Sequence, residues 1–509
     1  MTPLDWTMVG LYGAVALAIG IWITRRSSSG ANEFLLGGRR VPTAAVLFSL
    51  VATELSAATF VGVPSGAYGA VAWTYLQFGI GSILARVVLA IWVIPLYHRR
   101  RVRTVYEFIG SRFGEGARRA TAITFLIGRW LASSVRLFIA AEAFSLVIGG
   151  GVDRAIIGCG VIAALYSVSG GIRAVIWTDA WQGAVLLAGA IALLAAIAEA
   201  APDGLGSIFE WARSHDATRV FSFGAATAGA TGDTPSWLAT IFASSSHIVT
   251  AVLGGFFLTL ATHSTDHDMV QRLLTAKSGR SGGRALILSG FVNVPVVVLF
   301  LAIGTGFLAL DDFAGVTRSA EPSRHVVAHF VKETMAAPWR GVVIAGLFAA
   351  AMSSLDSAIC AMGATWSVDV CPPMRQSEPE TREAWRERRN ALGVAVALIV
   401  GSLGFASYDR HFADPSLSLV EVALSAMTVV SGALLGVFGA GFLTRRGSSR
   451  GAVIGLLSGS VIGAGLFSQK LLLGTVPISW PWWIPISGAI TFFVVCSFRG
   501  EHQASQVPA

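Results

Sequence analysis

One hydrophobic stretch of the sequence, residues 346–357, carries three serine hydroxyls and one carboxylate. If the stretch is helical, Ser353, Asp356 and Ser357 stand at positions i, i+3 and i+4, so that their oxygen atoms share one face. Oxygen ligands of this kind suit a small hard cation. The spacing therefore predicts a cation site on one face of a helix in apolar surroundings.

A second polar interruption lies in another apolar run, at Thr53, Glu54 and Ser56, and is followed by Pro64 and several glycines. Helices that break at membrane depth do so where their freed backbone carbonyls line a cavity. A carboxylate at that depth is costly unless it has a partner. We therefore expect Glu54 to belong to a functional site.

Further charges lie within apolar runs. Arg129 and Arg136 are seven residues apart, nearly on one face of a predicted helix, and Asp179 lies near the start of another. For Asp179 the expected counter-charge is either Arg173 or a bound cation.

The elements that must position these side chains are membrane-spanning helices. The 509 residues are 54% hydrophobic and 13% charged, with a mean hydropathy of +0.67, which is unlike a soluble globular protein. Thirteen apolar runs are long enough to cross a hydrocarbon core about 30 Å thick. They fall at residues 8–24, 43–64, 69–97, 120–148, 151–169, 175–200, 237–266, 285–309, 339–369, 390–406, 418–443, 451–468 and 479–497. We expect an all-α polytopic membrane protein with about 13 transmembrane helices.

The net charge of +8 alone is compatible with nucleic-acid binding, but the positions of the basic residues argue against it. Most of the 37 lysine and arginine residues fall in alternate loops between the apolar runs. The positive-inside rule then places the amino terminus outside and the carboxyl terminus in the cytoplasm. We expect a multi-pass protein of the plasma membrane whose partners are lipid and a small-molecule solute, without nucleic acid or an obligate protein partner.

The polar interruption at residues 53–56 recurs five predicted helices later, at residues 262–268. Because five is odd, the second set of five helices enters the membrane from the opposite side, as an inverted-repeat transporter requires. His263 and His267 in this second interruption are four residues apart, but nothing else completes a zinc ligand set, so we expect no zinc there.

Five segments in order match one known family: residues 34–39, 170–182, 265–278, 350–357 and 432–438. Together they resemble the sodium:solute symporter family, which includes sodium/glucose, sodium/proline and sodium/sialic acid carriers. The resemblance implies secondary transport driven by a sodium gradient and a LeuT-type fold with a 5+5 inverted repeat. The implied parts are a leading helix and cytoplasmic loop at 1–40, a ten-helix core at 41–446, and two accessory helices with a short cytoplasmic tail at 447–509.

The resemblance also implies a first sodium site between the second and ninth helices. Its ligands would be the backbone carbonyls of Ala52, Leu55 and Ala350 and the hydroxyls of Ser353 and Ser354. Carbonyls freed by an unwound helix are suitable acceptors for a hard cation.

Some relatives similar to the sialic acid carriers have a second sodium site, which here would comprise Asp179, Ser353, Asp356 and Ser357. Asp356 stands where those carriers have a serine. The extra carboxylate would strengthen a cation site, share a proton with Asp179, or form a structural contact with an arginine. The sequence therefore leaves open whether one or two sodium ions bind, and whether transport is coupled to protons.

The family places its solute between the second, third, fourth and seventh helices. Residues 127–129 resemble the place where sialic acid carriers have a carboxylate-binding arginine, so Arg129 would hold an acid through its bidentate fork. Neutral hydrogen bonds would come from Thr53, Ser56, Thr59 and Gln77. At the last of these positions, Phe78 fits equally well.

Glu54 suggests a zwitterion whose amine meets Glu54 and whose carboxylate meets Arg129; the alternative is that Glu54 and Arg129 pair with each other. We expect a sodium-coupled symporter that imports a small organic anion or zwitterion, such as an amino acid or a sialic acid, by alternating access. The alternatives are a sugar or polyol symporter, a proton-coupled carrier of the same fold, and a membrane sensor or scaffold. We do not expect an enzyme, because Ser353, Ser354 and Asp356 have no histidine at matching depth.

Overall fold

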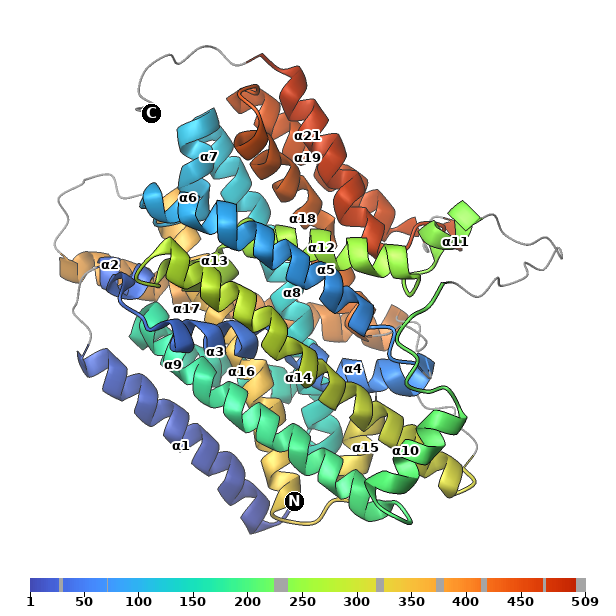
Figure 1. Cartoon of the computed structure of the whole chain (residues 1–509). Coiled ribbons are helices and arrows are strands. Elements are labelled where there is room, and N and C mark those ends of the chain that lie inside the picture. Colours follow the sequence, from blue (N-terminus) through green and yellow to red (C-terminus); the bar gives the residue numbers. More distant parts are fainter. Residues whose placement is uncertain are drawn as a thin grey trace.

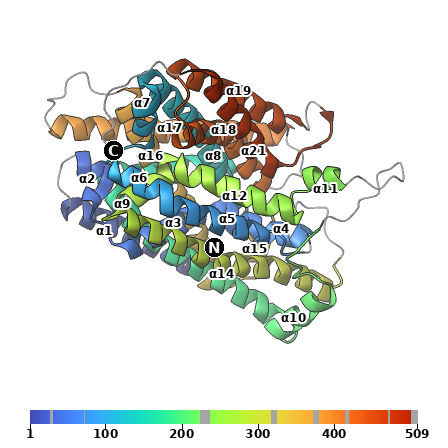
Figure 2. The same ribbon diagram turned by 45° about the horizontal axis from the view of Figure 1, so that its top comes forward.

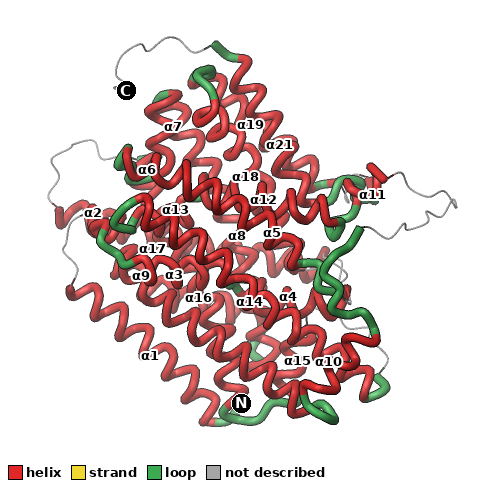
Figure 3. Tube along the Cα trace, viewed as in Figure 1, coloured by secondary structure: helices red, strands yellow, loops and turns green. Residues whose placement is uncertain are grey.

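The apolar runs of the sequence become long helices that pack side by side (Figure 1). The computed structural model describes residues 1–26, 31–70, 72–223, 237–316, 325–371, 380–412, 419–469 and 473–499. Within these ranges every regular element is helical, apart from one isolated bridge between Val41 and Ala276 (Figure 3). The expected all-α class is confirmed.

The α-helices run from the first to the last described segment in this order: α1 (Pro3–Arg26), α2 (Ala31–Leu36), α3 (Thr43–Glu54), α4 (Ala57–Ala70), α5 (Leu76–Val88), α6 (Ile94–Arg99), α7 (Val105–Phe113), α8 (Glu115–Ile148), α9 (Val152–Ala200), α10 (Leu205–Ser214), α11 (Trp237–Ala243), α12 (Ile248–Ser264), α13 (His267–Leu274), α14 (Gly279–Phe313), α15 (Val326–Glu333), α16 (Trp339–Thr365), α17 (Glu380–Phe412), α18 (Leu419–Leu443), α19 (Ser449–Phe467) and α21 (Trp483–Ser497). Shorter helical segments are η1 (Gly37–Arg39), η2 (Leu89–Val93), η4 (Trp366–Val370) and η5 (Trp480–Trp482).

Each of the thirteen expected runs coincides with one helix or with consecutive helices of the described ranges. Among the described residues, nine helices are long and apolar enough to cross a membrane, and eleven do so if each of two bent pairs is one span. Two expected runs merge in α9, which is divided by a non-helical residue, Gly171 (φ 60°, ψ −175°). A Cβ atom there would lie 2.9 Å from the carbonyl oxygen of Phe34, so only glycine fits this kink.

Two helices of the core are broken, as the polar interruptions predict. The chain turns by 53° between α3 and α4. At this break Leu55 leaves the helical conformation (φ −81°, ψ 86°). The second break separates α12 from α13, where the Asp266 side chain accepts a hydrogen bond from the Asp268 backbone at 2.9 Å and caps α13. Both breaks therefore expose backbone and side-chain oxygen atoms inside the bundle.

Close packing of α9 against α3 and α16 sets the frame around the first break. A Cβ atom on Gly183 of α9 would lie 3.0 Å from the Cβ of Ala52 in α3. Gly189 of α9 faces Gly346 of α16, where an added Cβ would meet backbone atoms within 3.3 Å. These contacts bring the end of α3 and the serine-rich part of α16 next to each other.

The outermost helices lie on opposite sides of the bundle. α1 runs along one side, where it packs on α9 and α16, and α19 and α21 form the other side, where they pack on α18 (Figures 1 and 2). The broken helices and α5, α8, α14 and α16 lie between them, and this is where the candidate site is found.

Candidate functional site

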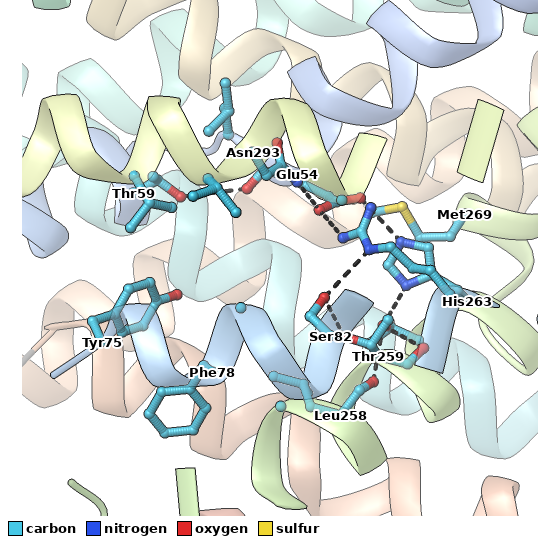
Figure 4. A pocket seen from close by; sticks show the side chains of 18 of the residues that line it. Glu54, Thr59, Tyr75, Phe78, Ser82, Leu258, Thr259, His263, Met269 and Asn293 are labelled. Atoms are coloured by element: carbon cyan, nitrogen blue, oxygen red, sulfur yellow. Dashed lines mark hydrogen bonds and ion pairs between the residues drawn. The ribbon is translucent and has the colours of Figure 1, made fainter. Parts of the chain in front are cut away.

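A cavity of about 210 Å³ lies beside the break between α3 and α4 (Figure 4). We call it the central cavity. Its walls come from α3, α4, α5, α8, α12, α13 and α14, and from η5 near the end of the described chain. The side chains with polar or charged groups in these walls are Glu54, Thr59, Tyr75, Ser82, Arg86, Arg136, Thr259, Thr262, His263, Asp266 and Asn293.

Glu54 is one of two carboxylates in this wall, and both of its oxygen atoms have hydrogen-bond partners. Its Oε2 atom accepts a hydrogen bond from Arg86 Nη2 at 2.5 Å, and Oε1 lies 3.0 Å from His263 Nε2. The Asn293 amide also donates to Oε2, and Figure 4 shows His263 and Asn293 turned toward the carboxylate. The alternative that Glu54 pairs with Arg129 is therefore wrong, because Arg86 of α5 and His263 of α12 lie nearer.

Arg129 does not face the central cavity in the described structure. Its guanidinium is buried and donates to Asp266 Oδ2 at 3.0 Å and to Asp268, the two carboxylates beside the break between α12 and α13. These two acids occupy the donors that we expected to hold a solute carboxylate. Two helical turns further along α8, Arg136 reaches the central cavity instead.

The four side chains expected to donate neutral hydrogen bonds to the solute do not all line the central cavity. Thr59 lines the central cavity, and its hydroxyl donates to the Glu54 carbonyl at 3.3 Å. Thr53 turns toward α9, donating to the Ser49 carbonyl at 2.8 Å and to Asp179 at 3.4 Å. Ser56 is buried, and neither it nor Thr53 is among the described residues that line the cavity.

Gln77 and Phe78, which the sequence did not separate, have different roles in the structure. The Gln77 side chain is fully buried, donating to the Ser246 carbonyl at 2.9 Å and accepting from the Ser222 backbone at 3.3 Å, so it fastens two loop segments. Phe78 lines the central cavity, and its ring stacks on Trp480 with centroids 5.2 Å apart.

Several cavity residues were not assigned to the site from the sequence. Arg86 and Asn293 are polar residues inside apolar runs, which is the signal that could have found them. His263 drew attention only as half of a possible zinc pair. Trp480 offered no signal, because it stands in an aromatic segment near the end of the chain, far from the other cavity residues in sequence.

The residues expected to bind the first cation, namely Ala52, Leu55, Ala350, Ser353 and Ser354, lie where α3 ends against α16, and we call them the first cation site. The Ser353 hydroxyl lies 3.3 Å from the carbonyl oxygens of both Ala52 and Ala350. The Ser354 hydroxyl is buried and has no hydrogen-bond partner among the described residues. The carbonyls of Ala52 and Leu55 stand at the end of α3, where carbonyls lack partners within the helix, so these two oxygens suit a hard cation such as sodium.

Two residues of the possible second cation site, Asp179 and Ser357, contact an arginine. Asp179 Oδ2 accepts from Arg272 Nη2 at 3.1 Å, and the same nitrogen donates to Ser357. Arg173, one of the two expected counter-charges of Asp179, instead pairs with Glu33 at 2.9 Å. For Arg173 the expectation is wrong, because the cationic side chain that contacts Asp179 is Arg272 of α13.

Asp356, the fourth residue predicted for this site, is bonded to α9 as well. Its Oδ2 atom accepts a hydrogen bond from Gln182 Nε2 at 3.3 Å. Asp356 is fully buried, as are Asp179 and Ser357. The helix spacing read from the sequence thus places Ser353, Asp356 and Ser357 on the face of α16 that meets α3 and α9.

Comparison with known proteins identifies the family. The sequence profile of the sodium:solute symporter family matches residues 34–459. The sodium/sialic acid symporter NanT of Aliivibrio fischeri is 26% identical over 464 residues, covering 89% of this chain and 86% of that protein. Human sodium-coupled monocarboxylate transporter 1 is also 26% identical, over 90% of this chain and 72% of its own length.

Solved structures show the same fold. A Na+-coupled sialic acid symporter superposes with a TM-score of 0.82 at 19% sequence identity, covering 97% of both chains. Mhp1, a nucleobase-cation-symport-1 family transporter, superposes with a TM-score of 0.52 at 14% identity, over 91% of this chain and 93% of its own. The chain therefore belongs to the sodium:solute symporter family, and it is a sodium-using, multi-pass membrane transporter with a LeuT-type fold.

Proposed function

We propose that this protein is a sodium-coupled symporter that imports a small organic anion or zwitterion through the central cavity. The observation that carries the proposal is that one break in a helix serves both the cation site and the cavity. The Ala52 carbonyl lies 3.3 Å from the Ser353 hydroxyl, and Glu54, Leu55 and Thr59 line the cavity, so that the carbonyls of Ala52 and Leu55 would bind the cation directly beside the cavity wall.

This shared break gives a physical route for coupling. A sodium ion bound between α16 and the end of α3 would hold the α3 carbonyls in place. Because Leu55 belongs to both sites, an ion that fixes its backbone also fixes the adjoining cavity wall. The solute then binds a wall that sodium has already ordered, so each ligand raises the affinity for the other.

The charges of the cavity support a solute with a carboxylate. Arg136 lies in the wall, and Arg86 is held there by Glu54 and Ser82. We propose that Arg136 takes the role first expected of Arg129 and binds the solute carboxylate. Glu54, with Arg86 and His263 as neighbours, would receive an amine if the solute carries one. Two similar proteins are named for sialic acid and monocarboxylate transport, and both solute classes bear a carboxylate.

The orientation and division of the chain are part of the proposal. The distribution of basic residues supports an amino terminus outside and a carboxyl terminus in the cytoplasm. The ten core helices would lie within residues 41–446, with residues 447–509 accessory except where Trp480 enters the cavity wall. Labelling of single introduced cysteines from each side of the membrane would test the orientation.

Uptake by purified protein in liposomes tests the function. Solutes are first found by a thermal-shift screen of amino acids, sialic acids, sugars and carboxylates, with and without sodium. We expect radiolabelled uptake of the solute found to require an inward sodium gradient and to collapse in Ser353→Ala. The matched control is Ser402→Ala, because Ser402 is equally buried but bonds within α17 and to Ser134 of α8. Uptake that is driven by a pH step without sodium would overturn the proposal.

A further inference from the structure

Arg272 of α13 is the largest side chain that the described structure buries completely. Each nitrogen of its guanidinium is engaged: Nε donates to Ser49 at 2.9 Å, Nη1 donates to Asp268 Oδ1 at 2.6 Å, and Nη2 donates to Asp179 and Ser357. A planar guanidinium held on every nitrogen has one orientation available to it. Arg272 is therefore a fixed positive charge in the interior.

The oxygens around this guanidinium come from several helices. Ser49 belongs to α3, Asp179 to α9 and Ser357 to α16, whereas Arg272 itself belongs to the half-helix α13 after the second break. A carboxylate and two hydroxyls are ligands that a hard cation would also use. In this structure the cation among them is part of the protein.

Charge alternates through the buried groups around Arg272. Arg129 contacts Asp268, Asp268 contacts Arg272, and Arg272 contacts Asp179, so each acid lies beside at least one arginine. A sodium ion at Asp179 would stand next to the guanidinium, and two like charges repel strongly in a low-dielectric interior. If Arg272 were absent, Asp179 and Asp268 would both lack the positive charge that lies between them. A bound cation would then be favoured beside these two carboxylates.

We propose that Arg272 acts as a tethered cation at Asp179, so that a single sodium ion, bound at the first cation site, accompanies each solute. The inference rests on the proposed sodium-coupled transport. The same contacts join α13 to α9 and α16, so the charge that excludes a second ion also fastens the half-helix behind the second break. Replacement of Arg272 by a neutral side chain opens the oxygen cluster to a second sodium ion.

The test is the sodium dependence of uptake in liposomes, together with the sodium:solute ratio from reversal potentials. For the unmodified protein we expect a Hill coefficient for sodium of about one and a ratio of about one. In Arg272→Met, which keeps most of the length but not the charge, we expect the Hill coefficient to rise toward about two. The matched control Arg272→Lys retains the charge and should keep a coefficient of about one.

A ratio of about two in the unmodified protein overturns the inference, as does a coefficient that stays at about one in Arg272→Met. If Arg272→Met does not fold, Asp179→Asn decides: we expect slower uptake at an unchanged ratio, and a ratio that drops by one ion would show that sodium binds at Asp179. Sodium-independent uptake by the unmodified protein would instead overturn the proposed function itself, so the two failures are distinguishable.

Discussion

The substitution Glu54→Gln removes the negative charge that Arg86 depends on. The Arg86 side chain is 3% exposed and that of Glu54 is 16% exposed, so water screens their contact at 2.5 Å only weakly. Removing one partner of a buried ion pair costs about 3–5 kcal/mol, because the other charge stays buried without compensation. The glutamine keeps oxygen and nitrogen atoms near His263 and Asn293, so we expect the low end, a loss of about 3 kcal/mol in the free energy of unfolding.

Denaturant unfolding of the purified protein measures this loss. Two further variants test whether the loss comes from the uncompensated charge of Arg86. Glu33→Gln removes an ion pair of similar length, but Arg173 is 41% exposed, so we expect a loss below about 1 kcal/mol. In the double variant Glu54→Gln with Arg86→Met, the uncompensated charge is gone, and the total loss should be smaller than the sum of the single losses. Losses that simply add, or equal losses in Glu54→Gln and Glu33→Gln, would refute the reasoning.

Two other substitutions test the walls of the central cavity. Arg136→Met should raise KM for a carboxylate solute by roughly tenfold or more, since a charged hydrogen bond is lost. Arg129→Met should mainly lower the melting temperature, because Asp266 then loses its arginine and Asp268 keeps only Arg272. Equal KM changes in both would contradict the assignment. Trp480→Ala should raise KM about threefold or more because it removes the stack on Phe78, and Trp482→Ala, outside the described cavity lining, should not.

The helices and their breaks could be predicted because the signals for them are local. Apolar runs of spanning length gave the helices, and a carboxylate with hydroxyls inside such a run marked the break after Glu54. The face shared by Ser353, Asp356 and Ser357 followed from helical periodicity alone. Each of these features depends on residues within a single continuous stretch of the chain.

The partners of the charged side chains could not be predicted, because they depend on distances between helices. Asp179 has Arg173 six residues away in sequence, yet pairs with Arg272, which is 93 residues away. Arg129 and Arg136 lie on nearly the same face of α8, and only the position of Asp266 and Asp268 decides which one is occupied.

At the start of α5, the sequence did not decide which of two adjacent residues, Gln77 or Phe78, belongs to the site. Successive residues of a helix point about 100° apart, so a count that is off by one exchanges a cavity residue for a structural one. Gln77 and Phe78 illustrate this, because one fastens loops and the other lines the cavity. Gln77 contacts loop segments that are distant in the sequence, and such contacts cannot be found from the residues around position 77.

The central claim is that the break between α3 and α4 couples the first cation site to the central cavity. It is tested most directly by measuring the affinity for the solute found in the screen at several sodium concentrations, and the affinity for sodium at several solute concentrations. We predict that each ligand raises the affinity for the other by the same factor, and that Ser353→Ala removes this factor while Ser402→Ala retains it. A solute affinity that is the same with and without sodium in the unmodified protein would contradict the account.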